Sequence, residues 1–487
     1  MKKILSGICL SLMLALPAMA QWSSDSFLIA RAGGVVATYG NKALFVNGGS
    51  WELYDMNTFN STTGVLSLTR ISIKAASVAN KAYFGGGQYG PYTDPVYTNN
   101  VDVYDFNTGL WKLSKLSNAR EVGASAAIGN KVLFAGGRNA LSMFNTVDIF
   151  DVTTGVKTTA RLSKGRTNIS VGVNGNKVVF AGGWSYDFNY NRPESNVADI
   201  YDAVSGTWTK ALLSQKRQSM DVASVGNKIV FFGGLPINGG ISNKVDIYDA
   251  SANTWSVYTL PLARYATTVN VVGSKAYFAG GTGASNRVDV YDASTNIWTS
   301  FNMPIGVVAA AGAVINNNIF YAGGYDYTTN VVTNIVQIYN TTSNTWSTDV
   351  ISLARAGSLV VSFGNTTLFA GGYTKVTYRT IESKMIDIYT SPQLRMSNKP
   401  IANKTLFPAE LTVYPNPATD VFQVSLPKET ALPFVISIFD LQGMLIEKHT
   451  MKDYNMVLQL GHLPKGNYIL SGFDTHGIRI SKIIVKQ

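Results

Sequence analysis

The chain has 487 residues, of which 46% are apolar and 14% are charged, and its formal net charge is +11. An apolar content this high over so long a chain supports a large buried core. The cationic residues form no run, so the charge is a mild basic bias. It argues against nucleic acid as a partner, and acidic glycans, acidic peptides or lipopolysaccharide surfaces fit it better.

The first twenty residues predict an export signal. Lys2 and Lys3 precede an apolar run at residues 4–16, and an A-x-A motif ends at Ala20, which predicts cleavage between Ala20 and Gln21. The run is too short to cross a bilayer, and no later segment has about 18 uncharged apolar residues, so we expect no transmembrane segment.

The next segment, QWSSDSFLIARAGG at residues 21–34, resembles a stretch more than three hundred residues downstream. Residues 345–358 read TWSTDVISLARAGS, and in both segments an arginine follows the tryptophan by nine positions. The alternation of residues 21–28 predicts a β-strand.

A repeat of about 46 residues extends from residue 21 to residue 390. An apolar run ends in a diglycine, and an aromatic residue beside an acid or amide follows, as in VYD at 103–105. Short alternating runs predict four antiparallel strands per repeat, and Asn-Lys pairs such as Asn130-Lys131 predict tight turns, where Asn tolerates a left-handed backbone. The diglycines lie at residues 48–49, 86–87, 136–137, 182–183, 233–234, 280–281, 323–324 and 371–372.

In five repeats a tryptophan follows the aromatic residue by seven positions, and these are Trp111, Trp208, Trp255, Trp298 and Trp346. The combined pattern resembles the kelch repeat, which implies an all-β fold, a β-propeller of four-stranded blades. The eighth repeat lacks its last strand, and residues 21–28 have the sequence of that strand. We therefore expect eight blades over residues 21–391, closed by the N-terminal strand, with seven blades and an irregular unit as the alternative.

After a polar linker at residues 392–409, the alternating strands of residues 410–487 predict a small Ig-like β-sandwich. This block resembles the C-terminal sorting domain of the type IX (Por) secretion system of Bacteroidota. The matching elements are VYPNP (413–417), IFDLQG (438–443), LPKGNY (463–468) and KIIVK (482–486). The resemblance implies Sec export, then passage through the type IX machinery to the cell surface or the medium. An ordinary Ig-like binding module is the alternative.

The repeats contain no cysteine and no histidine, two residue types that often act as catalytic groups or metal ligands. Cys9 lies in the export signal, and His449, His462 and His476 lie in the C-terminal block at spacings that suit no compact metal site. A Ser-His-Asp or Cys-His nucleophile and a copper-radical oxidase are therefore excluded, and we expect no metal and no cofactor. The repeats contain four glutamates, and among these few acid–base candidates Glu121, next to Arg120, is the most suggestive. It keeps open the alternative of a carbohydrate-acting enzyme such as a sialic-acid mutarotase-like isomerase.

One arginine recurs in seven repeats, ten residues before the Asn or Ser of the next turn, and Val307 replaces it in the seventh repeat. Alternating strands would place it at one mouth of the central channel, where Arg138 is expected to join it. The series either clamps carboxylates or sulfates of a ligand, or bridges neighbouring blades through carbonyls or Asp. Its members are Arg31, Arg70, Arg120, Arg166, Arg217, Arg264 and Arg355.

The loops that follow the diglycines vary in length and are rich in aromatic residues, a composition that suits sugar stacking or protein contacts on a rigid scaffold. They should lie on the same face as the arginines. The sequence thus predicts a binding or adhesion module for a glycan or protein ligand. The expected aromatic contacts are Tyr92, Trp184, Tyr186, Tyr325 and Tyr373.

Overall fold

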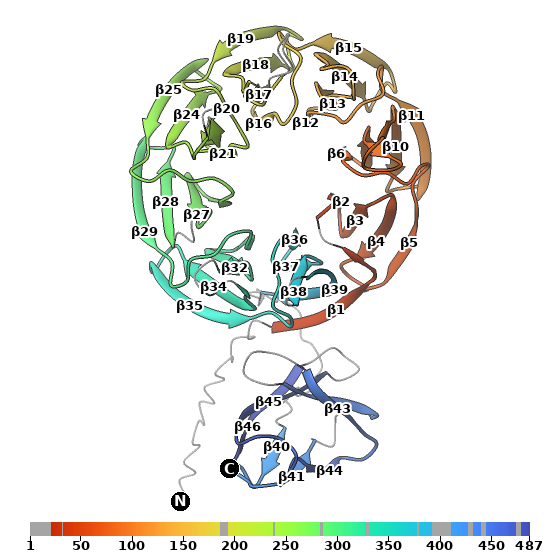
Figure 1. Cartoon of the computed structure of the whole chain (residues 1–487), viewed down its shortest axis with the longest axis vertical. Helices are drawn as coiled ribbons and strands as arrows, with labels where there is room; N and C mark the ends of the chain where they lie inside the picture. The colour runs from red at the N-terminus through yellow and green to blue at the C-terminus, as the bar shows by residue number, and fades with distance from the viewer. Residues whose placement is uncertain are drawn as a thin grey trace, which may run out of the picture.

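The computed structural model describes residues 21–31, 33–185, 193–236, 239–282, 286–326, 329, 331–376, 379–391, 411–426, 432–439, 445–473 and 479–487. Over these residues the chain is all-β, with no helix. Figure 1 shows radial sheets arranged in a ring around a common axis, followed by a smaller β-domain.

Eight antiparallel blades form the ring, and each has four strands ordered from the axis to the rim. Blade 1 has β2 (Val35–Tyr39), β3 (Lys42–Asn47), β4 (Ser50–Asp55) and β5 (Ser61–Val65). Blade 2 has β6 (Lys74–Val78), β7 (Lys81–Gly85), β10 (Asn100–Asp105) and β11 (Leu110–Lys115). Blade 3 has β12 (Ala124–Ile128), β13 (Lys131–Ala135), β14 (Thr146–Asp151) and β15 (Lys157–Arg161). Blade 4 has β16 (Ser170–Asn174), β17 (Lys177–Ala181), β18 (Val197–Asp202) and β19 (Trp208–Leu212).

The second half of the ring repeats this order. Blade 5 has β21 (Asp221–Val225), β22 (Lys228–Phe232), β24 (Lys244–Asp249) and β25 (Thr254–Thr259). Blade 6 has β26 (Thr268–Val272), β27 (Lys275–Ala279), β28 (Arg287–Asp292) and β29 (Ile297–Asn302). Blade 7 has β30 (Ala311–Ile315), β31 (Asn318–Ala322), β34 (Ile335–Asn340) and β35 (Thr345–Val350). Blade 8 has β36 (Leu359–Phe363), β37 (Thr366–Ala370), β39 (Arg379–Thr390) and, at the rim, β1 (Gln21–Arg31).

Short ribbons extend the loops that follow four of the diglycines. β8 (Gln88–Tyr89) pairs with β9 (Val96–Tyr97), and β32 (Tyr325–Asp326) pairs with β33 (Val331–Val332). β23 (Leu235–Pro236) pairs with β20 (Arg217–Gln218), and β38 (Tyr373–Val376) pairs with β39. We call the side of the ring that carries these ribbons the loop face.

The turns between the first and second strands differ from expectation in one respect. In blade 3 the left-handed residue is Gly129, with φ of 56°, and Asn130 follows it. Nδ2 of Asn130 instead donates to Oδ2 of Asp151 at 2.9 Å, at the end of the third strand. The expectation of a left-handed Asn130 was therefore wrong, since this side chain ties the turn to the neighbouring strand while glycine supplies the conformational freedom.

The predicted aromatic pairs pack one blade onto the next. Tyr201 and Trp208 lie opposite each other on β18 and β19, with ring centroids 4.9 Å apart. With Phe180 they pack against the core of blade 3, which includes Leu133 and Val147, both 0% exposed. The interfaces between blades are thus the hydrophobic core of the ring, and no blade completes its core alone.

β1 completes blade 8, as the sequence predicts, so the ring has eight blades (Figure 1). Trp22 pairs with Tyr389 across β1 and β39, and its Nε1 donates to Asp349 of blade 7 at 2.7 Å. Oδ2 of Asp25 accepts from Oη of Tyr54 in blade 1 at 2.6 Å. One strand therefore contacts blades 7, 8 and 1, and Trp22 has the repeat position that Trp346 has in blade 7.

The C-terminal domain is a sandwich of two antiparallel sheets. One sheet has the order β40 (Thr412–Tyr414), β41 (Val421–Ser425), β44 (Asn455–Gln459). The other has the order β43 (Leu445–Met451), β42 (Phe434–Phe439), β45 (Gly466–Phe473), β46 (Arg479–Lys486). Phe422, Ile436 and Leu470, all 0% exposed, belong to its own core.

Candidate ligand-binding site

Seven of the eight blades are preceded by a buried arginine whose exposure is 0 to 1%. Each guanidinium group forms an ion pair with an acid in the third strand of the blade that it precedes. The pairs are Arg31–Glu52, Arg70–Asp102, Arg120–Asp148, Arg166–Asp199, Arg217–Asp246, Arg264–Asp289 and Arg355–Asp387.

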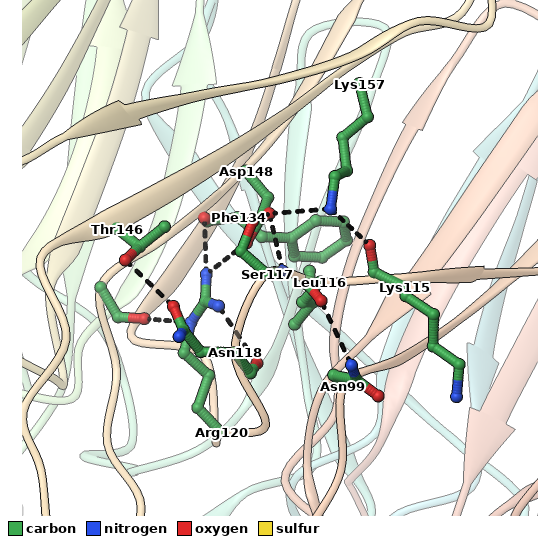
Figure 2. A network of polar contacts seen from close by, with 11 residues as sticks. Asn99, Lys115, Leu116, Ser117, Asn118, Arg120, Phe134, Thr146, Asp148 and Lys157 are labelled. Atoms are coloured by element: carbon green, nitrogen blue, oxygen red, sulfur yellow. Dashed lines mark hydrogen bonds and ion pairs between the residues drawn. The ribbon is translucent and has the colours of Figure 1, made fainter.

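Figure 2 shows this arrangement at Arg120. Nη2 lies 2.9 Å from Oδ2 of Asp148, and Nε donates to the main-chain oxygen of Gly136 at 2.8 Å. The second carboxylate oxygen of Asp148 accepts from the main-chain nitrogen of Ser117 at 2.9 Å. Burial lowers the pKa of Arg120, and the charge of Asp148 opposes that shift. The pair thereby joins the incoming loop to the second and third strands of blade 3.

The main chain of the same residue continues the link to the preceding blade. The oxygen of Arg120 accepts from the nitrogen of Gly87, the second glycine of blade 2, at 2.9 Å. The arginine series therefore bridges neighbouring blades, the second of the two interpretations drawn from the sequence. Contact with a ligand through these seven guanidinium groups is not possible in this structure, because protein atoms enclose each one.

Blade 7 lacks both members of the pair. Val307 replaces the arginine, and Gln337 replaces the acid at the matching position of β34. Nε2 and Oε1 of Gln337 bond to the main-chain oxygen and nitrogen of Ile305, at 3.0 and 2.7 Å. The joint loss of both charges is expected if each stabilises the other, since a single buried charge without its partner is costly.

A cleft of about 290 Å³ opens on the loop face at blades 2, 3 and 4. It contains three of the residues that the sequence singled out, Glu121, Arg138 and Trp184. Each lies at a repeat position, because Glu121 follows a buried arginine, and Arg138 and Trp184 each follow a diglycine. The other lining residues are Ser72, Ile73, Lys74, Val122, Gly123, Thr167 and Asn168.

Backbone pairing holds these residues in place. The nitrogen and oxygen of Glu121 bond to the oxygen and nitrogen of Arg138, both at 2.9 Å, and Thr167 pairs with Trp184 in the same way at 2.9 and 3.0 Å. Gly137 permits the first pairing, since its φ is +107° and a Cβ there would lie 1.9 Å from the main-chain oxygen of Glu121. The diglycine thus brings the residue that follows it to the cleft.

The side chains form a compact polar and aromatic cluster. Nη2 of Arg138 lies 2.9 Å from Oε2 of Glu121, and these side chains are 29% and 13% exposed. Cζ of Arg138 lies 5.9 Å from the ring centre of Trp184, within the range of a cation–π contact. Hydrogen-bond donors, hydrogen-bond acceptors and an aromatic ring therefore line one partly shielded cleft.

Two family models match the chain. The Kelch motif matches residues 308–348, which cover the start and most of the strands of blade 7. The secretion system C-terminal sorting domain matches residues 412–486. The chain is a kelch-repeat protein with a type IX sorting tail. The sorting domain directs it through type IX secretion to the cell surface or the medium. A comparison with curated proteins found no match.

Three further predicted contacts of the kelch propeller are described by the structure, and none of the three lines the cleft. Tyr92, 91% exposed, lies in the turn between β8 and β9 of blade 2. Tyr325 and Tyr373 follow the diglycines of blades 7 and 8 and pair with Val308 and Ala356. Tyr186 lies outside the described residues, as does Ala20 at the expected cleavage point.

The sequence interpretation missed four polar residues that line the cleft: Ser72, Lys74, Thr167 and Asn168. Three of them could have been identified from their position relative to the recurring arginine. Thr167 follows its buried arginine by one position, as Glu121 does, and Ser72 and Asn168 follow theirs by two. Ser72 and Asn168 also share a left-handed backbone, with φ of 59° and 53°.

The sorting domain brings two histidines to one carboxylate. Nε2 of His449 lies 3.3 Å from Oε2 of Glu447, and Nε2 of His462 lies 3.7 Å from Oε1 of the same residue. No group of three or more side chains suited to hold a metal ion occurs within the described ranges, and His476 lies outside them. None of the described segments forms a helix capable of crossing a bilayer.

Asp221, at the start of the innermost strand of blade 5, should make stability depend on pH. Its carboxylate accepts from the nitrogen and hydroxyl of Thr267 at 2.9 Å, and burial raises its pKa to about 6. The folded state therefore binds the proton more tightly than the unfolded chain, so stability falls as pH rises from about 4 through 6. We expect a loss of about 2 kcal/mol, because each unit of pKa shift is worth about 1.4 kcal/mol and the side chain is partly exposed.

Asp221→Asn tests this expectation, because the amide oxygen still accepts from Thr267 but carries no charge. Urea unfolding at pH 4, 5, 6 and 7 should show a smaller decline for the variant than for the wild type. Parallel curves for the two proteins would contradict the assignment.

Proposed function

We propose that the kelch propeller is a binding or adhesion module of the cell surface or medium, and that its ligand, a glycan or a protein, occupies the cleft at Glu121, Arg138 and Trp184. Export by the Sec route on residues 1–20, with cleavage between Ala20 and Gln21, is part of the proposal. The observation that carries it is the convergence of the three residues from two blades in one cleft. Loops held on a rigid scaffold are a common place for such contacts.

The alternative proposal, a carbohydrate-acting isomerase resembling sialic-acid mutarotases, would use Glu121 as acid or base. Such an enzyme should place a Glu or Tyr against two or more arginines. In the described residues the carboxylate of Glu121 forms its ion pair with Arg138. An array of donors and acceptors around a single ion pair supports binding more directly than acid–base chemistry.

The test is a screen of the full-length protein on a glycan array and against a 12-residue random peptide library. Trp184→Ala and Arg138→Ala should each weaken binding of any selected ligand by about tenfold or more, because truncation of aromatic and arginine contacts in a partly shielded site has the largest effects. Leu235→Ala is the matched control, since Leu235 follows the diglycine of blade 5 outside the cleft. Equal binding by wild type and both cleft variants would place the ligand elsewhere.

A further inference from the structure

The ion pair in the cleft leaves little positive charge for an anionic ligand. Arg138 already lies 2.9 Å from the carboxylate of Glu121, and the two side chains are largely shielded from water. A carboxylate or sulfate on a ligand would have to displace Glu121 from the guanidinium group or sit beside a like charge. At short range in a partly shielded site such repulsion is strong.

The other arginines near the loop face also pair with acids. All seven members of the buried series have an acid partner, and Arg287, outside the cleft lining, shares Asp289 with the buried Arg264, its Nε lying 2.8 Å from Oδ1. The arginine series, which by sequence pointed to carboxylates or sulfates, thus provides no anion site. Besides Arg138, the lining contains one other cationic side chain, Lys74. This side chain is exposed, so water and salt screen its charge.

The polar groups of the cleft suit hydroxyls, which both donate and accept. Glu121 offers a carboxylate acceptor and Arg138 offers N–H donors, 2.9 Å apart, while Ser72 and Thr167 add hydroxyl groups. Two adjacent hydroxyls of a sugar ring can therefore donate to the carboxylate and accept from the guanidinium group without breaking the pair. No charge on the ligand is required.

The apolar part of the lining is smaller. Trp184, Ile73 and Val122 contribute to it, and the first of these is the one aromatic side chain of the lining. A peptide that binds by apolar anchors needs a deep hydrophobic pocket, whereas one aromatic wall beside many polar groups fits the C–H face of a sugar. The composition of the lining favours a saccharide over a peptide.

We propose that the cleft binds a neutral saccharide unit, whose hydroxyls donate to the Glu121 carboxylate and accept from the Arg138 guanidinium group. The inference rests on the proposed function, and it assigns the ligand class: neutral glycans, in contrast to the acidic glycans that fit the net charge of the sequence.

Glu121→Gln gives the sharpest test, because it removes the acceptor charge and releases Arg138. Binding of the full-length wild type and variant is measured on neutral glucan, galactan, mannan and N-acetylhexosamine oligosaccharides and on matched uronate and sulfated series. The wild type should bind a neutral series, with less than about a twofold change between 50 and 500 mM NaCl, since no ion pair with the ligand forms. Glu121→Gln should lose about tenfold toward that series and gain affinity for the anionic series.

The other outcomes are equally decisive. A wild type that prefers anionic glycans, with binding that falls steeply in salt, overturns the inference and leaves the proposed function standing. The inference is also overturned, and the proposed function again stands, if the wild type binds only library peptides and Trp184→Ala abolishes that binding. No binding of any probe by the wild type refutes both. Leu235→Ala, together with an unchanged melting temperature of Glu121→Gln, shows that loss of fold is not the cause.

Discussion

Removal of residues 21–28 should open the ring and lower the free energy of unfolding by at least about 5 kcal/mol. The deletion removes most of the pairing between β1 and β39. It also removes Phe27, 1% exposed and 4.8 Å from the ring of Phe45 in blade 1, and Trp22, 5.1 Å from the ring of Tyr389. Truncation of one buried aromatic side chain alone costs about 3–5 kcal/mol. It would in addition expose the edge of β39, an aggregation hazard.

Guanidinium unfolding and limited proteolysis of the truncated and intact chains measure this effect. Trp346→Ala is the matched comparison for Trp22→Ala, since both residues have the same repeat position and only Trp22 lies on the closing strand. We expect early proteolytic cleavage in blade 8 for the truncated chain and for Trp22→Ala, and not for Trp346→Ala. An intact unfolding midpoint after the truncation would show that the ring does not depend on β1.

The second large effect is expected at the buried pair of blade 3. Asp148→Ala leaves Arg120, 0% exposed, without its carboxylate, and removal of one partner of a buried pair costs about 3–5 kcal/mol. The chain itself supplies the compensating change. Because blade 7 has Val307 and Gln337 at these two positions, Arg120→Val combined with Asp148→Gln should cost less than Asp148→Ala alone.

Urea unfolding of the single and double variants measures the difference, and Glu121→Gln is the control. The pair of Glu121 with Arg138 is partly exposed, so its loss should cost less than about 1 kcal/mol. If the double variant is less stable than Asp148→Ala, the substitution in blade 7 does not compensate for the lost charges as we infer.

Much of the fold could be predicted from the repeat. The diglycines, the Tyr and Trp positions and the alternating runs predicted four strands per blade, and the resemblance of residues 21–34 to residues 345–358 predicted the closing strand. The strands within one blade are local features, since strand pairing across a short turn depends on the residues within one repeat. The closing strand pairs with a distant segment, and it could be predicted because it repeats the sequence of the matching strand in blade 7. The turn residue Asn130 was misread because the pattern did not distinguish a left-handed residue from a side chain that bonds to the third strand.

The candidate site could be predicted only in part. Glu121, Arg138 and Trp184 were identified because each stands beside a repeat landmark, a buried arginine or a diglycine. Their convergence depends on how two neighbouring blades pack, which no single repeat encodes. The approach of His449 and His462 to Glu447 in the sorting domain is a further contact between segments that the sequence spacing did not indicate.

The sequence by itself determined the repeated four-stranded unit, its closing strand and the sorting tail, because periodicity and short motifs record these directly. The tertiary structure decided what the arginines do. A repeat position places the Cα atom of an arginine on the loop face, but the side chain is long enough to reach inward, and the acid that receives it lies about thirty residues away on another strand. Folding therefore decides between the two roles that the sequence left open for the arginine series, since it forms seven structural ion pairs, and it leaves the compensated pair of Arg138 and Glu121 at the cleft.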